Sequence, residues 1–317
     1  MPISRSQVVV LALALDRFIG DPPNRYHPVA WMGSLIARAE RHAPAGGNLA
    51  RLAYGAGIDA AGMALVASTG WLASRTLGRL PRPLAYLGEA VLLKMVIALH
   101  GLCAAATEVH AALESGDLPE ARRLLSWHLV SRDTSALDTS QVAAATIESV
   151  AENNSDGVIA PLFYYALGGL PGALAYRFAN TADSMLGYHD PIREWLGKVP
   201  ARLDDVTNLI PARLTACLLN AAAWLHGGNA AVAYLIRRRD ASQTASPNAG
   251  HPMSVMAGAL GVELEKVGHY RLGAGLNVAR PDDIPKAVRL MHTATLLGAG
   301  ALLVTGAVFH RRAKRRT

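Results

Sequence analysis

The sequence predicts an all-α integral membrane protein, a helical bundle with about four or five spans and long polar functional loops. Of its 317 residues, 51% are hydrophobic and only 17% are charged. An average soluble domain carries about 25% charged residues. Aromatic residues make up only 6% of the chain, so its apolar mass is mainly small aliphatic residues, as in tightly packed membrane helices. This composition excludes a disordered or nucleic-acid-coating protein and argues against an ordinary soluble enzyme.

Three apolar stretches carry no formal charge and approach or exceed the roughly 20 residues that a membrane-spanning helix requires. They are residues 158–176, 214–236 and 290–309. Two weaker candidates, 52–77 and 84–107, each contain two charged side chains. We therefore expect a multi-pass protein of the cell inner (cytoplasmic) membrane.

Basic clusters at 237–239 and 311–316 both favour a cytoplasmic position, but one span between them cannot satisfy both, so the orientation stays open. Polar loops are expected at about 108–157, 177–205 and 237–289. No internal repeat or long linker divides the chain. We therefore expect a single membrane domain, residues 1–317.

Three carboxylates precede the first charge-free run. Glu148, Glu152 and Asp156 are spaced by four, which would align them on one face of a helix, with Asn153 beside them. Like charges at this spacing repel one another, so a solvated face is the ordinary explanation. Carboxylates at a membrane boundary that face a cavity are nevertheless candidates for function. We favour the functional interpretation here.

A second acidic cluster follows the same run. Asp204 or Asp205 together with Asn208, at helical spacing, offers oxygen ligands to a hard cation such as Mg²⁺, which usually takes one or two protein carboxylates. Asn180 and Asp183 lie a short distance upstream. Together the acidic clusters place six carboxylates within about sixty residues of one another.

Two polar segments each have a structural and a functional interpretation, of equal weight only in the first. In Ser131-Arg132-Asp133-Thr134, Asp133 or Thr134 would cap a following helix, or Arg132 would bind phosphate beside the helix start. Asp21 precedes two prolines that forbid a helix, and a capped helix exit is the default explanation there.

Several familiar signatures are absent from the sequence. It contains no P-loop, no Gly-x-Gly-x-x-Gly fingerprint, and no His-Glu-x-x-His or Cys-x-x-Cys pair. Cys103 and Cys217 lie singly in apolar runs, which makes a disulfide framework improbable. His100, His110 and His226 are likewise isolated, and we interpret them as packing residues.

The ordered series of motifs resembles the adenosylcobinamide-phosphate synthases, the CobD/CbiB family of cobalamin biosynthesis. The matching motifs are Gly20-Asp21-Pro22-Pro23 with His27-Pro28-Val29, Ser131-Arg132-Asp133-Thr134, Glu148-x-x-x-Glu152-Asn153-x-x-Asp156-Gly157, Ala160-Pro161-Leu162-Phe163, Asn180-Thr181-x-Asp183-Ser184-Met185-x-Gly187-Tyr188, Asp204-Asp205-x-x-Asn208, Pro211-Ala212-Arg213 and Ser246-Pro247-Asn248-Ala249-Gly250. Small departures at Asn154, Ala182 and His251 remove no charged motif residue.

The resemblance implies an amide ligase that joins adenosylcobyric acid to (R)-1-aminopropan-2-ol O-phosphate or a related amino alcohol, with ATP and Mg²⁺ as cofactors. The implied partners are the corrinoid, the amino alcohol phosphate and the lipid bilayer. Nucleic acid is not expected. A homo-oligomer, or a complex with other corrinoid-pathway membrane enzymes, is left open.

Site roles are assigned as hypotheses on that basis. Asp204, Asp205 and Asn208 would hold the Mg²⁺-nucleotide together with Asp183. Glu152 or Asp156 would accept the proton of the attacking amine, with Glu148 as a further catalytic acid. The remaining polar residues of the motifs would bind phosphate groups or cofactor: Arg132, Asn153, Asn180, Arg202, Arg213 and Asn248.

Two alternative functions fit parts of the pattern. An intramembrane Mg²⁺-dependent prenyltransferase would need a second Asp-rich motif, and Asp204-Asp205 has no obvious twin. A non-enzymatic transporter would usually show repeated halves, and the sequence shows none.

Overall fold

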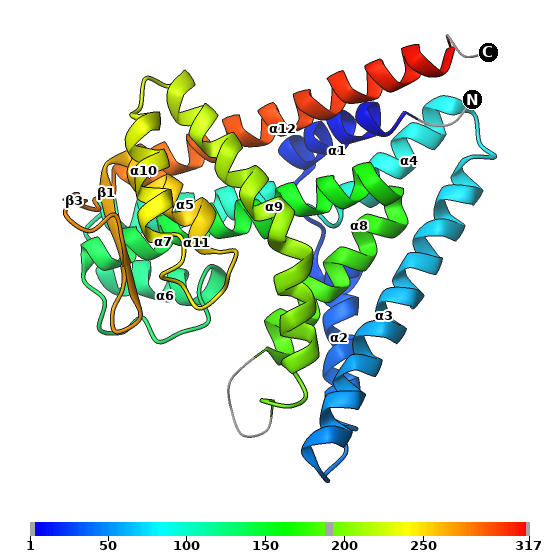
Figure 1. Cartoon of the computed structure of the whole chain (residues 1–317), viewed down its shortest axis with the longest axis horizontal. Helices are drawn as coiled ribbons and strands as arrows, with labels where there is room; N and C mark the ends of the chain where they lie inside the picture. Colours follow the sequence, from blue (N-terminus) through cyan, green and yellow to red (C-terminus); the bar gives the residue numbers. More distant parts are fainter. Residues whose placement is uncertain (1–3, 188–192, 315–317) are drawn as a thin grey trace. The chain divides into compact units, whose positions relative to one another are not determined.

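The computed structural model describes residues 4–187 and 193–314, with side chains as far as residue 304. Helices make up most of the described chain, with one small sheet (Figure 1). The predicted all-α membrane class is therefore confirmed. The chain packs as two compact units, each assembled from separate stretches of sequence. This division does not test the prediction of a single membrane domain.

Unit 1 comprises residues 1–98, 160–208 and 301–317. Its helices are α1 (Arg5–Ile19), α2 (Pro28–Glu40), α3 (Asn48–Leu77), α4 (Arg82–Lys94), α8 (Ala160–Leu186) and the start of α9 (Lys198–Leu225), with a short 3-10 turn, η1 (Asn24–Tyr26). A buried apolar cluster joins α2 to α8 through Met32, Ile36, Phe178 and Leu186. Because α3 packs along α8, unit 1 holds the polar second half of α8 next to a long apolar helix.

Unit 2 comprises residues 99–159 and 209–300. It contains α5 (Leu99–Glu114), α6 (Leu118–His128), α7 (Thr139–Asn154), the π-helical turn η2 (Ser155–Ile159), α10 (Ala230–Asp240), α11 (Gly250–Leu260), and most of both α9 and α12 (Asp283–Lys314). Strands β1 (Val262–Lys266), β2 (Tyr270–Leu272) and β3 (Asn277–Val278) form a sheet of order β2-β1-β3. Strand β1 pairs antiparallel with β2, where Leu264 faces Leu272, and parallel with β3.

Three stretches of the described chain are long and apolar enough to cross a membrane: Asn48–Leu77, Thr139–Leu186 and Asp283–Val304. A fourth span arises if Arg82–Lys94 and Leu99–Glu114, which are bent by 43°, count as one. The weaker predicted span at 52–77 is therefore a strong candidate in the structure. Only 22% of its apolar window is buried, so most of that apolar surface requires lipid or another apolar partner.

The predicted span at 214–236 is wrong. Helix α9 ends at Leu225 and α10 begins at Ala230, so the apolar run is divided between two helices. Gly227 between them has φ 72°, a left-handed conformation that ends a helix, and Asn229 caps α10 through Val232 N. Hydropathy alone did not reveal this turn.

Helix α8 is interrupted in a way that orients its polar half. Gly169 has φ 67° and Pro171 follows, so the regular hydrogen-bond ladder cannot continue there. The Arg5 guanidinium donates to the freed carbonyls of Ala166 and Leu167 at 2.8 and 3.0 Å. The bend is therefore stabilised within unit 1, and the segment beyond it carries the candidate site residues of α8.

Candidate functional site

The first candidate cluster lies in unit 1, between α8 and the start of α9. Asp204 is 8% exposed, and each of its carboxylate oxygens accepts an amide hydrogen bond. Asn180 Nδ2 donates to Oδ1 at 3.2 Å and Asn208 Nδ2 donates to Oδ2 at 2.9 Å. Tyr176, stacked on Tyr164, donates its hydroxyl to Asn208 Oδ1 at 2.8 Å. The amides are therefore held in a fixed orientation around one buried carboxylate.

The electrostatics of this cluster favour the binding of a positively charged ligand. Burial raises the pKa of Asp204 despite the hydrogen bonds from Asn180 and Asn208, and the neighbouring Asp205 carboxylate adds to the rise. Arg177 opposes it. Asp205 itself pairs with the exposed Arg202 at 3.3 Å. The two adjacent aspartates therefore occupy different surroundings, although the sequence assigned both to a metal.

Asp59 of α3 joins the Asp204 cluster, and the sequence-based assignment missed it. Its side chain is 2% exposed and interacts electrostatically with Asp204. Neither of its carboxylate oxygens has a hydrogen-bond partner among the described residues. A carboxylate inside an apolar helix is itself a signal of function, but in the sequence Asp59 stood out only as an interruption of a span.

The second cluster lies in unit 2, around Glu148 of α7. Glu148 is 5% exposed, and its Oε2 lies 3.7 Å from Arg132 Nη2. Its other oxygen, Oε1, has no hydrogen-bond partner among the described residues. Burial and the charges of Glu148 and Glu152 raise the pKa of the Tyr270 hydroxyl on β2. Tyr270 and Lys266, which also interacts with Glu148, were not predicted, because the short sheet that carries them was not predicted either.

Two local predictions around this cluster need correction. Asp156 does not continue the α-helical face of Glu148 and Glu152, because it lies in the π-helical turn that follows α7. Such turns change the direction of side chains and are frequent at functional sites. The N-cap of α7 is Asp138, in a capping box with Gln141, rather than Asp133 or Thr134. Arg132 therefore lies before the helix as a partner of Glu148, not as part of a helix-start anion site.

A basic cluster also lies in unit 2 and brings together two predicted ligand-binding residues. Arg213 Nη1 donates to Asn248 Oδ1 at 3.2 Å. Arg237 Nε donates to His251 Nδ1 at 3.2 Å. Burial, with the charges of Arg213 and Arg237, lowers the pKa of His251 to about 4, so its ring is neutral at pH 7. Because Nδ1 accepts a hydrogen bond, the neutral ring carries its proton on Nε2 and can donate it.

The structure divides the other predicted residues between the two units. Asp183 lies on α8 in unit 1, whereas Glu152, Asn153 and Asp156 lie in unit 2. Asn153 Nδ2 donates to Ser149 O one turn back on its own helix. Tyr188, the last residue of one sequence motif, lies outside the described residues.

The N-terminal motif has a structural role in unit 1. Lys94 of α4 donates to the Gly20 carbonyl and pairs with Asp21 at 2.7 Å. Although burial opposes it, hydrogen bonds from His27 and Lys94 lower the pKa of Asp21 to about 2. Asp16, fully buried, lies 3.9 Å from the same ammonium group. The helix exit before Pro22 and Pro23 is thus tied to α4 by a buried cation.

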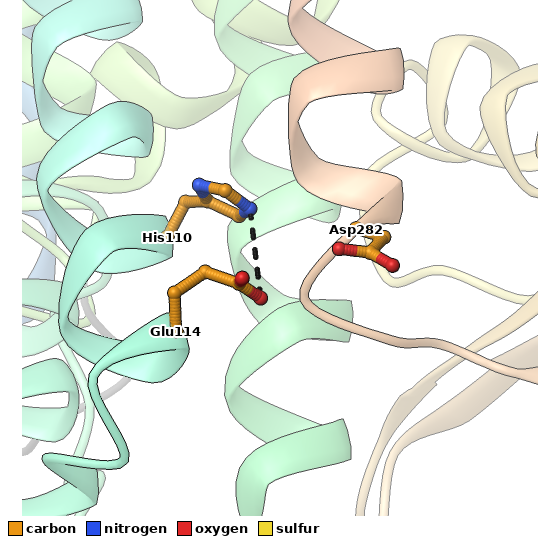
Figure 2. A group of neighbouring side chains, drawn as sticks. All are labelled: His110, Glu114 and Asp282. Atoms are coloured by element: carbon orange, nitrogen blue, oxygen red, sulfur yellow. Dashed lines mark ion pairs between the residues drawn. The ribbon is translucent and has the colours of Figure 1, made fainter.

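One further group of potential metal ligands lies outside these clusters. Figure 2 shows His110 and Glu114 on α5 with Asp282, just before α12, and their ligand atoms all lie within 4.8 Å of one another. His110 Nε2 is 4.0 Å from Glu114 Oε1. Both acids are exposed, and exposed acidic groups of this kind are common without an ion. His110, interpreted from the sequence as a packing residue, lies beside these two acids.

Comparison with known proteins identifies the family. A family model described as CobD/Cbib protein matches residues 9–291. The chain belongs to the CobD/CbiB family. It is 41% identical over 96% of its length to a cobalamin biosynthesis protein CobD of Dehalococcoides mccartyi, of which the match covers 98%. It is also 41% identical over 95% of its length to a probable cobalamin biosynthesis protein CobD of Methanothermobacter thermautotrophicus, with 99% of that protein covered.

The chain is also similar to a relative that carries the name CbiB. The chain is 39% identical over 92% of its length to the cobalamin biosynthesis protein CbiB of Salmonella typhimurium, with 95% of that protein covered. No solved structure matches the chain. The resemblance inferred from the motifs is confirmed, and with it a role in cobalamin biosynthesis.

Proposed function

We propose that this protein is the amide ligase that joins a propionate carboxylate of adenosylcobyric acid to the amino group of (R)-1-aminopropan-2-ol O-phosphate, or of a related amino alcohol. The product would be adenosylcobinamide phosphate. The observation that carries the proposal is the match to cobalamin biosynthesis proteins over 96% of the chain, with its acidic and basic motifs intact. Family membership also argues against the prenyltransferase and transporter alternatives.

Forming an amide from a carboxylate in water is uphill, and ATP with Mg²⁺, when bound, would supply the activation by phosphoryl transfer. The potential metal ligands in unit 1 fit a Mg²⁺-nucleotide. Asp204 offers a buried carboxylate, and Asn180 and Asn208 hold it in place. The orphaned carboxylate oxygens of Asp59 point to a cation at the same place.

The basic cluster of unit 2 suits a phosphate group. Arg213 provides a permanently charged guanidinium, and Arg237 provides a second. His251, neutral because its pKa is about 4, can donate from Nε2 without adding positive charge. We assign this cluster to the phosphate of the amino alcohol or of the nucleotide.

The acids of α7 suit the proton transfer. As the amine attacks, it must lose a proton, and we assign that proton to Glu152, which is half-buried one turn after Glu148. The two carboxylates repel each other, and protonation of either relieves the repulsion. Arg132 pairs with Glu148 at 3.7 Å, which leaves Glu152 as the acceptor.

The membrane location fits the substrates. The corrinoid is large and amphipathic, so a site at the membrane surface gives it an interface, and we place the protein in the cell inner (cytoplasmic) membrane. Assembly with further copies, or with other membrane enzymes of the corrinoid pathway, remains part of the proposal.

The direct test uses purified protein in detergent with adenosylcobyric acid and the amino alcohol phosphate, followed by mass spectrometry of the corrinoids. Amide should form with Mg²⁺ and ATP together, and neither should suffice alone. Amide formed in full yield without nucleotide would overturn the ligase and indicate a pre-activated donor.

A further inference from the structure

The buried face of α3 carries one functional side chain. The buried residues of this helix are Gly55, Asp59, Gly62 and Gly70, so Asp59 is the only one among them with a side chain. Asp59 lies four residues after Gly55 and three before Gly62, on the same helical face. A Cβ at Gly55 would overlap the Leu196 carbonyl oxygen. The glycines therefore allow close packing that carries the Asp59 carboxylate into the interior of unit 1.

Two buried carboxylates interact there. Asp59 and Asp204 are 2% and 8% exposed and interact electrostatically. Arg177 is the guanidinium that interacts with Asp204 and also donates to Asn180 at 3.4 Å. One guanidinium cannot neutralise two carboxylates, and a buried carboxylate without a counter-charge is strongly destabilising.

A shared proton does not account for this geometry. A carboxyl–carboxylate pair places one oxygen of each acid within hydrogen-bond distance. Neither oxygen of Asp59 has a hydrogen-bond partner among the described residues. Asp204 accepts a hydrogen bond at each oxygen, as an ionised group does. Both acids thus present oxygen atoms that can still accept a positive ligand.

We propose that Asp59 and Asp204 together bind one divalent cation of the Mg²⁺ class, with Asn180 and Asn208 holding Asp204 in place and water completing the shell. Asp205, paired with Arg202 on the exposed side of α9, is not a ligand. Mg²⁺ typically takes one or two carboxylates and keeps several waters, which this pair provides. The role of this cation in binding the nucleotide rests on the proposed function. The binding of the cation itself does not rest on it.

Binding is tested on the full chain in detergent micelles, without substrates, by following the signal of free Mn²⁺ in electron paramagnetic resonance. Wild type should bind one Mn²⁺ per chain, and Mg²⁺ should displace it. Asp59→Asn should weaken this binding by at least about a hundredfold, the upper end of what substitutions beside a metal's ligands cost. Asp205→Asn should change it less than about threefold, and unchanged binding in Asp59→Asn would overturn the site.

A matched control separates ligand loss from unfolding. Glu89→Gln removes another buried acid of unit 1 but keeps an oxygen to accept the 2.7 Å hydrogen bond from Tyr165, and it should bind Mn²⁺ as wild type does. In EDTA, Asp59→Asn should unfold at the same temperature as wild type or higher, because it removes a buried charge. Mg²⁺ should then stabilise only wild type and Glu89→Gln. A loss of stability in EDTA would assign Asp59 a structural role instead.

The outcomes also separate this site from the proposed reaction. Asp59-dependent Mn²⁺ binding without amide formation would leave the site standing and reject the reaction. Mg²⁺-dependent amide formation without Asp59-dependent binding would reject the site alone. Wild type that binds no Mn²⁺ would overturn the site.

Discussion

Arg213 donates a 3.2 Å hydrogen bond to Asn248, and this contact joins two motifs that are 35 residues apart in the sequence. Arg213 lies on α9, and Asn248 precedes α11 within the Ser-Pro-Asn-Ala-Gly turn. Asn248 is 4% exposed, so its amide is a fixed acceptor that holds the guanidinium in one orientation. Arg213 Nη1 also donates to the Leu209 carbonyl at 2.9 Å, so two contacts with the protein fix the guanidinium.

Arg213→Gln should raise the KM for the amino alcohol phosphate or for ATP, whichever phosphate this cluster binds, by about 10- to 100-fold. That is the effect of one charged hydrogen bond, worth about 1.5–3 kcal/mol. Steady-state kinetics with each substrate varied in turn measures it. The control Arg123→Gln removes an exposed arginine paired with Glu120 and should leave both KM values unchanged. Equal effects of the two substitutions would contradict the assignment.

The His251 environment predicts a stability loss in mild acid. Burial and the nearby arginines lower its pKa from 6.5 to about 4, so the unfolded chain takes up a proton before the folded chain does. Its contribution to stability is complete above about pH 6.5 and is lost as the pH falls toward 4. Thermal unfolding in detergent at pH 7.5 and pH 5 measures this difference.

His251→Gln keeps a hydrogen-bond acceptor for Arg237 but cannot titrate, so its unfolding temperature should fall less between these two pH values. An equal fall in variant and wild type would show that other groups dominate the acid sensitivity.

The glycine face of α3 predicts opposite effects at two neighbouring positions. Gly55→Ala would place a methyl group against the backbone carbonyl of Leu196, which cannot move aside as a side chain can, and should lower the unfolding temperature. At Gly57 an added Cβ would meet no atom within 4 Å, so alanine there should be neutral or stabilising by up to about 1 kcal/mol through helix propensity. Comparable loss at both positions would contradict the packing of this helix.

The sequence predicted the class of the fold, most of the spans and the residues around Asp204, because composition, apolar runs and helical spacing are local signals. Asn208 lies one helical turn from Asp204, and their hydrogen bond follows from that spacing alone. The turn that divides the 214–236 run also had a local signal, Gly227-Gly228, but the hydropathy of the run outweighed it.

The features that the sequence did not predict depend on contacts between segments that are far apart in the sequence. Asp59 of α3 interacts with Asp204 of α9 because glycines let α3 pack closely against Leu196 and Phe178. Tyr270 interacts with Glu148 because a short sheet folds against α7. The π-helical turn that redirects Asp156 is not signalled by the helical spacing of the carboxylates. The division of one predicted acidic site between two units was for the same reason not foreseeable.

We propose that a carboxylate of the corrinoid is activated with ATP and then converted to an amide. Adenosylcobyric acid labelled with ¹⁸O in that carboxylate distinguishes this route from others. If the carboxylate oxygen attacks the terminal phosphorus of ATP and releases ADP, and the amine then displaces that phosphate from the carbonyl carbon, one labelled oxygen leaves with the phosphate. We predict one singly labelled inorganic phosphate for each amide formed, measured by mass spectrometry. Unlabelled phosphate, or amide formed with no phosphate released, would contradict the account.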